Sequence, residues 1–366
     1  MTTLVHHDGD DGNDGSQAMA KLASLLENIG MIDVDISRLT ARIPVVKFIC
    51  PVLINGDDDG DNNKVHVECD ISLQNPLACL NTSLLQTYSQ LLPEVGILAS
   101  IIKRWARNRD INDPSRHTLS SYGYVLMLLH FLHTHAGTSD GRIVSLLHDA
   151  TGYRSRDVPL DGVPLLPNLQ WVDPSWIKSP YGEYKERRVT TTDNTKSSSS
   201  SISHPSEPLF TVNAYFLRVP DVSSMNLLRQ RLSSSPTRPR PSIGLILAAF
   251  FRYHAHEFDH RRFVVAPGAS ISSHVEREAK AELDGWRLPG TAAICIEDPF
   301  ETFYDVAHVV TPGEFKRIKG EFVRAYTVLA HSCAEGMAIG VKGDKRKAEI
   351  LGRTILDRIC EPVIRE

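Results

Sequence analysis

Between Val65 and Leu132 the chain carries a carboxylate, a pair of cations and an aromatic residue at a helix start, which together suit a phosphorylated ligand. In residues 64–71, apolar residues alternate with His66, Glu68 and Asp70. This period of two predicts a half-buried strand, with Asp70 on its open face near the strand end. A lone aspartate there is ordinarily a surface carboxylate, so its meaning depends on the groups that follow it.

The helix predicted over residues 94–108 supplies the cations. Lys103 and Arg107 lie four residues apart and therefore share one face. Two cations on consecutive turns can bind successive phosphates, lysine as a point charge and arginine as a fork of donors. Taken alone, the same spacing also describes a solvated basic face. The opposite face is predicted to be buried, because apolar residues recur on it at helical spacing: Leu98, Ile101, Ile102 and Trp105.

A second helix is predicted to begin near residue 120. Thr118 and Ser120 are candidate N-caps for the apolar helix that continues to Leu132. A helix start presents free N–H groups and the positive end of the helix dipole, which favours phosphate. Tyr122 beside it offers a ring on which a base can stack. The alternative interpretation of Ser121-Tyr122 is an ordinary helix start.

Several segments, in order, resemble the terminal uridylyltransferases and cytoplasmic poly(A) RNA polymerases, which belong to the DNA polymerase β-like nucleotidyltransferases. In the first half they are ARIPVVKF at 41–48, CDIS at 69–72, NT at 81–82, KRWAR at 103–107, LSSYGYVLM at 119–127 and LPNLQ at 166–170. In the second half they are SIGL at 242–245, FFRY at 250–253 and IEDPFE at 296–301, which resemble the poly(A)-polymerase-associated module. The likeness covers about residues 18–329 apart from one insert.

The resemblance implies a set of site residues. Asp70 matches an aspartate that binds a catalytic metal and helps to activate an RNA 3′-hydroxyl, so it is the predicted catalytic and metal residue. The predicted nucleotide-binding residues match contacts to the sugar (Asn81, Thr82), to the triphosphate (Lys103, Arg107, Ser121), to the base face (Tyr122) and to the base edge (Asp298, Tyr304).

The activity implied by the resemblance is transfer of nucleotides from UTP or ATP to an RNA 3′ end, with Mg²⁺ or Mn²⁺ as cofactor. One departure concerns the metals. The family places an Asp-x-Asp pair on a strand before Asp70, and counting back from Ala41 puts that strand at or before Met1. In-line transfer uses two cations with several oxygen ligands each. We therefore expect an N-terminally incomplete enzyme that is inactive as given; the alternative is a non-catalytic protein that binds RNA or nucleotide, or scaffolds a partner.

Other acids offer weak substitutes for the missing pair. Asp33 and Asp35 have the right spacing but fall where the family has connecting residues, and they are predicted to be turn acids. The aspartates of residues 8–14 lie in a Gly-rich run that predicts a flexible tail. Those of residues 57–61 imitate a calcium loop but lack its glycine and its flanking helices, which favours a solvated hairpin tip.

The second departure concerns the base. Tyr304 stands where the uridylyltransferases place a histidine that reads uracil, and Asp305 and His308 replace an asparagine and an arginine. A tyrosine hydroxyl donates or accepts, so a preference for UTP is neither supported nor excluded. The alternative is that Tyr304 is a packed aromatic residue.

Composition agrees with a soluble two-domain protein. The chain has 366 residues, a hydrophobic content of 42% and a net charge of −4, so RNA binding must use a local basic patch. Lys185–Arg188 and His260–Arg262 are candidates. The six cysteines show no metal-binding spacing and are expected to be free thiols. No segment predicts a membrane span or a signal peptide, and we expect a cytoplasmic protein, with the nucleus as alternative.

The predicted fold class is α+β, the remnant of a mixed-sheet nucleotidyltransferase palm packed on a larger, mostly helical part. The predicted divisions are a flexible acidic tail (1–15), a partial palm of helix, strand, acidic loop and strand (16–80), a helical central domain (81–170), a Ser/Pro-rich and largely disordered insert (171–240), the polymerase-associated helical module (241–335) and a C-terminal extension (336–366). Within the insert, residues 209–216 predict a short strand, and the histidines at 254, 256 and 260 predict packing or surface positions.

Overall fold

A computed structural model of the chain describes residues 14–39, 44–53, 64–72, 76–134, 166, 168–170, 188–191, 210–213, 216–217, 219, 221–232, 242–268, 275–284, 286, 292–338 and 345–363. The chain forms two compact units. Unit 1 comprises Met1–Leu80 and Arg187–Asn213, and unit 2 comprises Asn81–Glu186 and Ala214–Glu366. None of the described helices combines the length and the hydrophobicity that a transmembrane helix requires. The mixture of helices and small sheets is the predicted α+β class.

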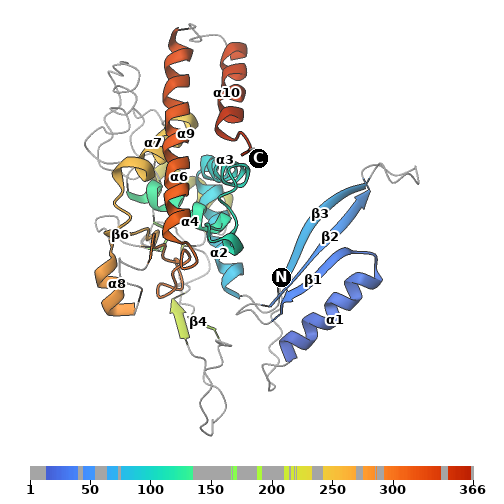
Figure 1. Ribbon diagram of the computed structural model, residues 1–366. Helices are drawn as coiled ribbons and strands as arrows, with labels where there is room; N and C mark the ends of the chain where they lie inside the picture. Colours follow the sequence, from blue (N-terminus) through green and yellow to red (C-terminus); the bar gives the residue numbers. More distant parts are fainter. Residues whose placement is uncertain are drawn as a thin grey trace. The chain divides into compact units, whose positions relative to one another are not determined.

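Unit 1 is built on an antiparallel sheet of three strands in the order β1-β2-β3, with helix α1 against it (Figure 1). The elements are α1 (Asp14–Asn28), β1 (Ile32–Arg38), β2 (Val45–Leu53) and β3 (Lys64–Ser72). Residues of α1 and of the sheet form one apolar cluster that includes Met19, Leu26 and Val46. The predicted helix and two of the strands are confirmed, whereas β1 was not predicted.

The sheet of unit 1 has two chemically different faces. Phe48 and Ile71 belong to the cluster that packs against α1, so their alternate neighbours Lys47 and Asp70 lie on the other face. Lys47 pairs with Asp70 on β3 and with Asp35 on β1. Residues directly opposite each other on neighbouring strands share a face. Asp35, Lys47 and Asp70 therefore form one row across the sheet.

Unit 2 is built around aromatic residues from four helices. After α2 (Pro76–Leu91), in which the boundary between the units falls, come α3 (Pro93–Asn108), α4 (Ser121–Thr134), α7 (Ile243–Arg252) and α9 (Pro312–Ala338). The fully buried Trp105 ring of α3 lies 4.9 Å from Phe251 of α7 and 5.1 Å from Phe322 of α9, measured between ring centroids. Burial of such rings contributes most of the packing energy of this unit.

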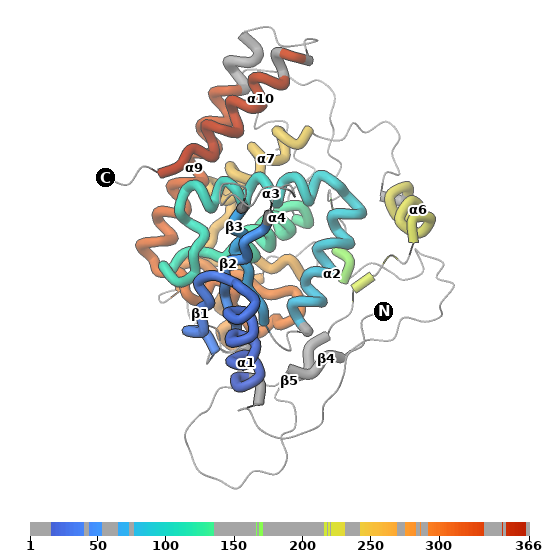
Figure 2. Tube along the Cα trace, turned by 90° about the vertical axis from the view of Figure 1, so that its right-hand side faces the viewer, coloured from blue at the N-terminus to red at the C-terminus, as the bar shows by residue number. Residues whose placement is uncertain are grey.

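Several further elements complete unit 2. A 3₁₀ turn η2 (Pro114–Arg116) precedes α4, a π-helix η4 (Tyr253–Glu257) continues α7, and the strands β6 (Phe263–Val264) and β7 (Val275–Glu276) form a small ladder before α8 (Arg277–Asp284). Helix α10 (Lys345–Ile359) lies beside α9, as both views show (Figures 1 and 2). Sequence patterns predicted α9 over residues 315–329 but did not predict α10.

The insert predicted over residues 171–240 contains described structure. β4 (Arg188–Thr191) pairs with β5 (Phe210–Asn213), which lies within the strand predicted for residues 209–216. Helix α6 (Val222–Leu232) is a correction to the prediction of disorder, since Met225 and Leu228 are buried. A low-hydropathy segment can still order a helix when two apolar residues on one face find a core. Residues 1–13 of the predicted acidic tail and the hairpin tip at residues 54–63 lie outside the described residues. The end of the predicted tail is corrected, because α1 begins at Asp14.

Four buried histidines join α4 to the segments that follow α7. His254 contacts His260 (Nδ1 to Nε2, 3.2 Å), and the ring nitrogens of His130 and His133 contact the carbonyl oxygens of Ala266 and Pro267. Burial lowers the pKa of His260 to about 3 and that of His133 to about 4. The prediction of packed or surface positions is confirmed, since His254 and His260 are buried and His256 is exposed. Because His260 is buried, it does not belong to a basic RNA-binding surface.

His133 and His260 predict a loss of stability in mild acid. Their folded pKa values lie below the unfolded value near 6.5, so protonation favours the unfolded chain. The free energy of unfolding should be constant above pH 6.5 and fall below it, by up to about 1.4 kcal/mol per pH unit for each group. Urea unfolding at several pH values measures this slope. His133→Gln should reduce the slope and the exposed His256→Gln should leave it unchanged; equal slopes in all three proteins would contradict the assignment.

Candidate nucleotide-binding site

Asp70 lies near the end of β3 and is exposed. It occupies the sheet face that α1 does not cover, as its alternation with Ile71 predicted. Its neighbour in the row is Lys47, whose charge lowers the pKa of Asp35. A cation between two carboxylates offsets their mutual repulsion.

Asp33 and Asp35 lie in strand β1, which corrects the prediction that they are turn acids. The strand is irregular there: its register shifts on both sides of Asp35, and Asp33 has a φ of 52°, in the left-handed region that aspartate tolerates. The Asp35 carboxylate accepts the backbone N–H of Ser37 at 2.8 Å, and this bond is the largest cause of its lowered pKa. Asp35 therefore accepts a hydrogen bond of the kind found in turns and also pairs with Lys47 of the neighbouring strand.

The next feature is whether the described side chains could bind a metal ion. Within the described ranges, no three His, Cys, Asp or Glu side chains come together in a way that could hold a metal ion. Magnesium requires near-octahedral oxygen coordination, and two-metal transfer requires two such sites. The described part of the chain therefore does not fit the metal pair by itself.

In unit 2, three predicted site residues from distant parts of the sequence meet. The Tyr122 hydroxyl at the start of α4 donates to Asp298 Oδ2 at 2.9 Å. The Asn81 side-chain amide on α2 donates to the same oxygen at 3.4 Å. Asn81 Oδ1 is buried and has no hydrogen-bond partner among the described residues. A buried acceptor without a partner is costly and marks a place where a ligand donor is needed.

The Asp298 carboxylate holds this group together. It is 4% exposed, and Oδ1 accepts the backbone N–H groups of Phe300 and Glu301 at 2.9 and 3.0 Å. Each Asp298 oxygen thus accepts two hydrogen bonds, which is as many as a carboxylate oxygen ordinarily accepts. Asp298 thus fixes the loop after α8 and the Tyr122 ring, while its predicted contact with a base edge stays a prediction.

Tyr122 is held as a neutral phenol. Its pKa lies well above the usual value, first because of burial and then because of the charge and the hydrogen bond of Asp298. A neutral hydroxyl donates to the carboxylate, which orients the ring. The ring is only partly covered. This is the arrangement that an aromatic surface for stacking requires.

The start of α4 is organised by capping. The Ser120 hydroxyl accepts the backbone N–H of Gly123 at 3.1 Å, so Ser120 is the N-cap, whereas Thr118 is buried and exchanges hydrogen bonds with Asp113. Ser121 is hydrogen-bonded to the Asn112 amide at 2.9 and 3.2 Å. Sequence analysis missed Asn112, because only the fold brings the turn before η2 to this helix start.

Lys103 and Arg107 are exposed on one face of α3, as predicted. Their neighbour Arg104 is also exposed and lies 3.8 Å from Asp357 of α10. The helix begins with Pro93 at its first turn, has Glu94 near the positive end of its dipole and has Arg107 in its last turn. Thr82 is exposed on α2 beside Asn81, and no described hydrogen bond brings it to the Asp298 group.

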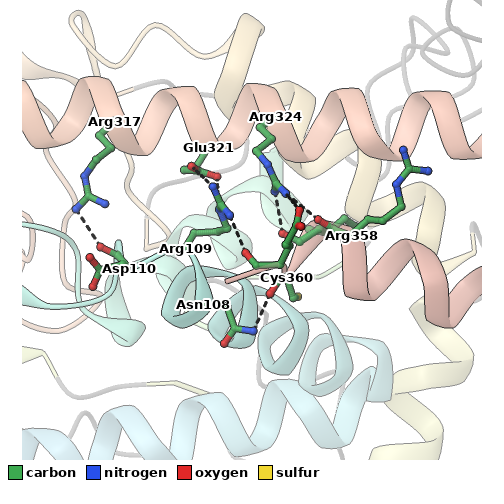
Figure 3. A network of polar contacts seen from close by, with 10 residues as sticks. Asn108, Arg109, Asp110, Arg317, Glu321, Arg324, Arg358 and Cys360 are labelled. Atoms are coloured by element: carbon green, nitrogen blue, oxygen red, sulfur yellow. Dashed lines mark hydrogen bonds and ion pairs between the residues drawn. The ribbon is translucent and has the colours of Figure 1, made fainter. Parts of the chain in front are cut away.

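The end of α3 is fixed to α9 and to the segment after α10 (Figure 3). Arg109 forms a two-point ion pair with Glu321 of α9 at 2.8 and 2.9 Å and donates to the carbonyl oxygen of Glu361 at 2.7 Å. The Asn108 amide donates to the Cys360 carbonyl oxygen at 2.7 Å. These bonds hold the turn of α3 that carries Arg107, and no sequence pattern predicted them.

Tyr304 is half-buried in the loop between α8 and α9. Its backbone N–H donates to the Glu301 carbonyl oxygen at 2.7 Å, and its ring lies 5.4 Å from the His308 ring. Asp305 accepts the backbone N–H groups of Ile296 and Ala307, each at 2.9 Å, and burial raises its pKa. Asp305 therefore shapes the loop on which Tyr304 and His308 are presented.

Comparison with known proteins finds matches in both units. The family described as "Poly(A) RNA polymerase, mitochondrial-like, central palm domain" matches residues 1–90, and the "Cid1 family poly A polymerase" family matches residues 242–302. Terminal uridylyltransferase cid1 of Schizosaccharomyces pombe is 26% identical over 297 residues, which are 79% of this chain and 55% of that protein. Poly(A) RNA polymerase GLD2 of Bos taurus is 29% identical over 293 residues, 79% of this chain and 42% of that protein.

The fold agrees with these matches. A solved structure of the Cid1 poly(U) polymerase with Mg 3′-dATP bound superposes with a TM-score of 0.52 and 24% identity, over 87% of this chain and 74% of that chain. The chain spans about half the length of the curated relatives it matches. The comparisons confirm the resemblance to terminal uridylyltransferases and poly(A) RNA polymerases, and with it the predicted fold class.

Proposed function

We propose that this chain, a homologue of the terminal uridylyltransferases and poly(A) RNA polymerases, takes part in adding nucleotides to RNA 3′ ends and binds the incoming UTP or ATP in unit 2. The single observation that supports this best is the meeting of Asn81, Tyr122 and Asp298 through hydrogen bonds. Asn81 of α2 and Tyr122 of α4 both donate to the carboxylate of Asp298, which lies in the loop before α9.

Each described group suits one part of a ribonucleotide. The Tyr122 ring, oriented by Asp298, offers a surface for the base, and the buried Asn81 Oδ1 lacks a donor that a sugar hydroxyl supplies. The α4 start beside Ser121 presents N–H groups to phosphate. Lys103 and Arg107 add positive charge on α3.

The proposed reaction is attack of the RNA 3′-hydroxyl on the α-phosphate, with pyrophosphate as leaving group. A bound Mg²⁺ or Mn²⁺ would stabilise the attacking and the leaving oxygens, and Asp70 would help to hold it. Asp70 is the residue that we assign to this chemistry. Since the described residues gather no metal centre, a second candidate is a non-catalytic protein that binds nucleotide or RNA.

A tailing assay combined with binding measurements tests the proposed site. The 366-residue chain is incubated with an RNA oligomer and each of the four nucleotides, and binding of Mg²⁺-UTP and Mg²⁺-ATP is measured in parallel. We expect weak nucleotide binding and no extension of the RNA. Absence of nucleotide binding would contradict the first candidate and leave the proposed site without support, and extension of the RNA would contradict the second candidate.

The acids of β1 give this assay a further test. If the chain does extend RNA, and Asp33→Ala with Asp35→Ala abolishes extension, then these strand residues replace the family's pair and our assignment of the metals is wrong. If Asp70→Asn leaves that extension unchanged, Asp70 has no catalytic role. Asp113→Asn, which changes a carboxylate at the turn before α4, serves as a control for substitution as such.

We further propose RNA as the macromolecular partner and the cytoplasm as the location, since one solved relative is described as a cytoplasmic RNA terminal U-transferase. The choice between UTP and ATP is proposed to depend on Tyr304. Tyr304→His should shift the ratio of UTP to ATP affinity towards UTP, and an unchanged ratio would show that Tyr304 is a packing residue.

A further inference from the structure

We propose that the segment 168–170 positions the three residues that we assign to the nucleotide in unit 2, and that Gln170 is the positioning residue for the loop of Asp298. The inference rests on the proposed function for the assignment of Asn81, Tyr122 and Asp298 to the nucleotide. The segment is joined through hydrogen bonds to α2, to α4 and to the loop before α9, which are the three elements that carry these residues.

The connection to α2 is a hydrogen bond to a buried tyrosine. The Leu169 backbone N–H donates to the Tyr88 hydroxyl oxygen at 3.0 Å, and the two residues are 0% and 1% exposed. Burial raises the pKa of Tyr88 well above its usual value, so the hydroxyl stays neutral. Tyr88 follows Asn81 by seven residues in α2, and residues at this spacing lie on one face of a helix. The segment is therefore attached to the face of α2 that carries Asn81.

The connection to α4 runs through one carbonyl oxygen. The Asn168 side-chain amide donates to the Pro267 oxygen at 3.2 Å, and His133 Nδ1 of α4 donates to the same oxygen at 3.0 Å. A carbonyl oxygen has two lone pairs, so it accepts both donors at once. The His133 ring also lies 5.3 Å from the Tyr88 ring, measured between centroids. The segment is therefore joined to the helix whose first turn carries Tyr122.

The connection to the loop before α9 is made by Gln170. Its side-chain amide donates to the Pro299 carbonyl oxygen at 2.7 Å, and Pro299 directly follows Asp298. The Gln170 backbone N–H donates to Asn168 Oδ1 at 3.0 Å, which fixes the segment internally. The Gln170 amide therefore sets the position of the carboxylate to which the other two site residues donate.

Gly268 confines the Gln170 side chain. A Cβ atom at Gly268 would lie 3.1 Å from Gln170 Oε1, below the separation of about 3.5 Å at which non-bonded atoms pack best. It would also lie 3.7 Å from the Cα and the carbonyl oxygen of Pro299. Glycine is thus the residue that permits this close approach of its backbone to both partners. We expect Gly268→Ala to displace the Gln170 amide.

Hydrogen exchange, followed by mass spectrometry without nucleotide, tests the positioning. The reporters are the backbone N–H groups of Phe300 and Glu301, which donate to Asp298 Oδ1. Gln170→Met keeps the side-chain length and removes the donor, so their exchange should become about 3- to 10-fold faster, as for the loss of one hydrogen bond. Gln170→Glu places a carboxylate against a carbonyl oxygen and should accelerate it further. Gln86→Met makes the same change at an exposed position of α2 and should have no effect.

A comparison of two nucleotides tests the consequence for the site. The ratio of the affinities for ATP and for 2′,3′-dideoxy-ATP reports on the sugar hydroxyls that we assign to Asn81 Oδ1. Gln170→Met and Gly268→Ala should each lower this ratio about threefold or more, because the acceptor no longer lies where the hydroxyl binds. A change that only reduced stability would weaken both nucleotides equally.

The outcomes separate this inference from the proposed function. Unchanged loop exchange in both Gln170 variants would overturn the inference. Exchange that rises as much in α9 as in the loop, or an unchanged affinity ratio with a faster-exchanging loop, would also overturn it, because the segment would then only stabilise the fold. If the unaltered chain binds no nucleotide, the proposed function is contradicted, and loop exchange alone decides whether Gln170 positions the loop.

Discussion

Replacing Tyr122 by alanine is expected to weaken the binding of ATP and UTP by about 5- to 150-fold, because a base stacked on an aromatic ring contributes about 1–3 kcal/mol. The ring is the described aromatic surface that Asp298 orients, and it lies at the start of the helix to which we assign the phosphates. Isothermal titration or fluorescence titration of the purified chain with each nucleotide measures the loss.

Tyr122→Phe is the matched control for this experiment. It keeps the ring and removes the hydroxyl that donates to Asp298 Oδ2, so it should retain most of the affinity that the alanine variant loses. A loss as large as that of the alanine variant would mean that the hydrogen bond, and not the ring face, carries the effect. Equal affinity in all three proteins would place the nucleotide elsewhere.

Local pattern predicted the elements that present the site. The alternation around Asp70 and the helical spacing around Trp105 each reflect one face in a core, and burial of that face decides the secondary structure. The same patterns placed Asp70, Lys103 and Arg107 on exposed surface. These predictions needed no knowledge of the partner element, since a period of two or of 3.6 is a property of the segment alone.

What pattern could not predict depends on contacts between distant segments. Strand β1 does alternate apolar and polar residues over residues 32–37, but the interpretation of Asp33 and Asp35 as turn acids passed over that pattern. Its register is irregular and most of its residues are exposed, so pairing with β2 and not burial of one face decides its structure. The convergence of Asn81, Tyr122 and Asp298 joins positions up to 217 residues apart. The bond between Ser121 and Asn112 depends on an αL residue, His117, that turns the chain before α4.

Removing the Arg109 side chain is expected to cause the largest loss of stability among the polar residues of Figure 3. Arg109 and Glu321 are only 13% and 15% exposed, and their two-point pair excludes water from both charges. Arg109→Met leaves the Glu321 carboxylate without its partner in this setting. We expect the free energy of unfolding to fall by about 2–4 kcal/mol, measured by urea unfolding.

Two further variants distinguish the contribution of the buried Arg109–Glu321 ion pair from that of an exposed ion pair. Arg353 is 76% exposed and forms an ion pair with Glu349. Arg353→Ala should therefore change the free energy of unfolding by less than about 0.5 kcal/mol. Arg109→Met combined with Glu321→Leu removes both charges, and it should recover part of the loss because no charge is left in the interior. A double variant as unstable as the sum of both single changes would show that the ion pair is not what couples α3 to α9. The double variant should also bind nucleotide more weakly if this pair positions the turn of α3 that carries Arg107. The reason is that methionine and leucine cannot donate a hydrogen bond to the Glu361 carbonyl oxygen, as Arg109 does.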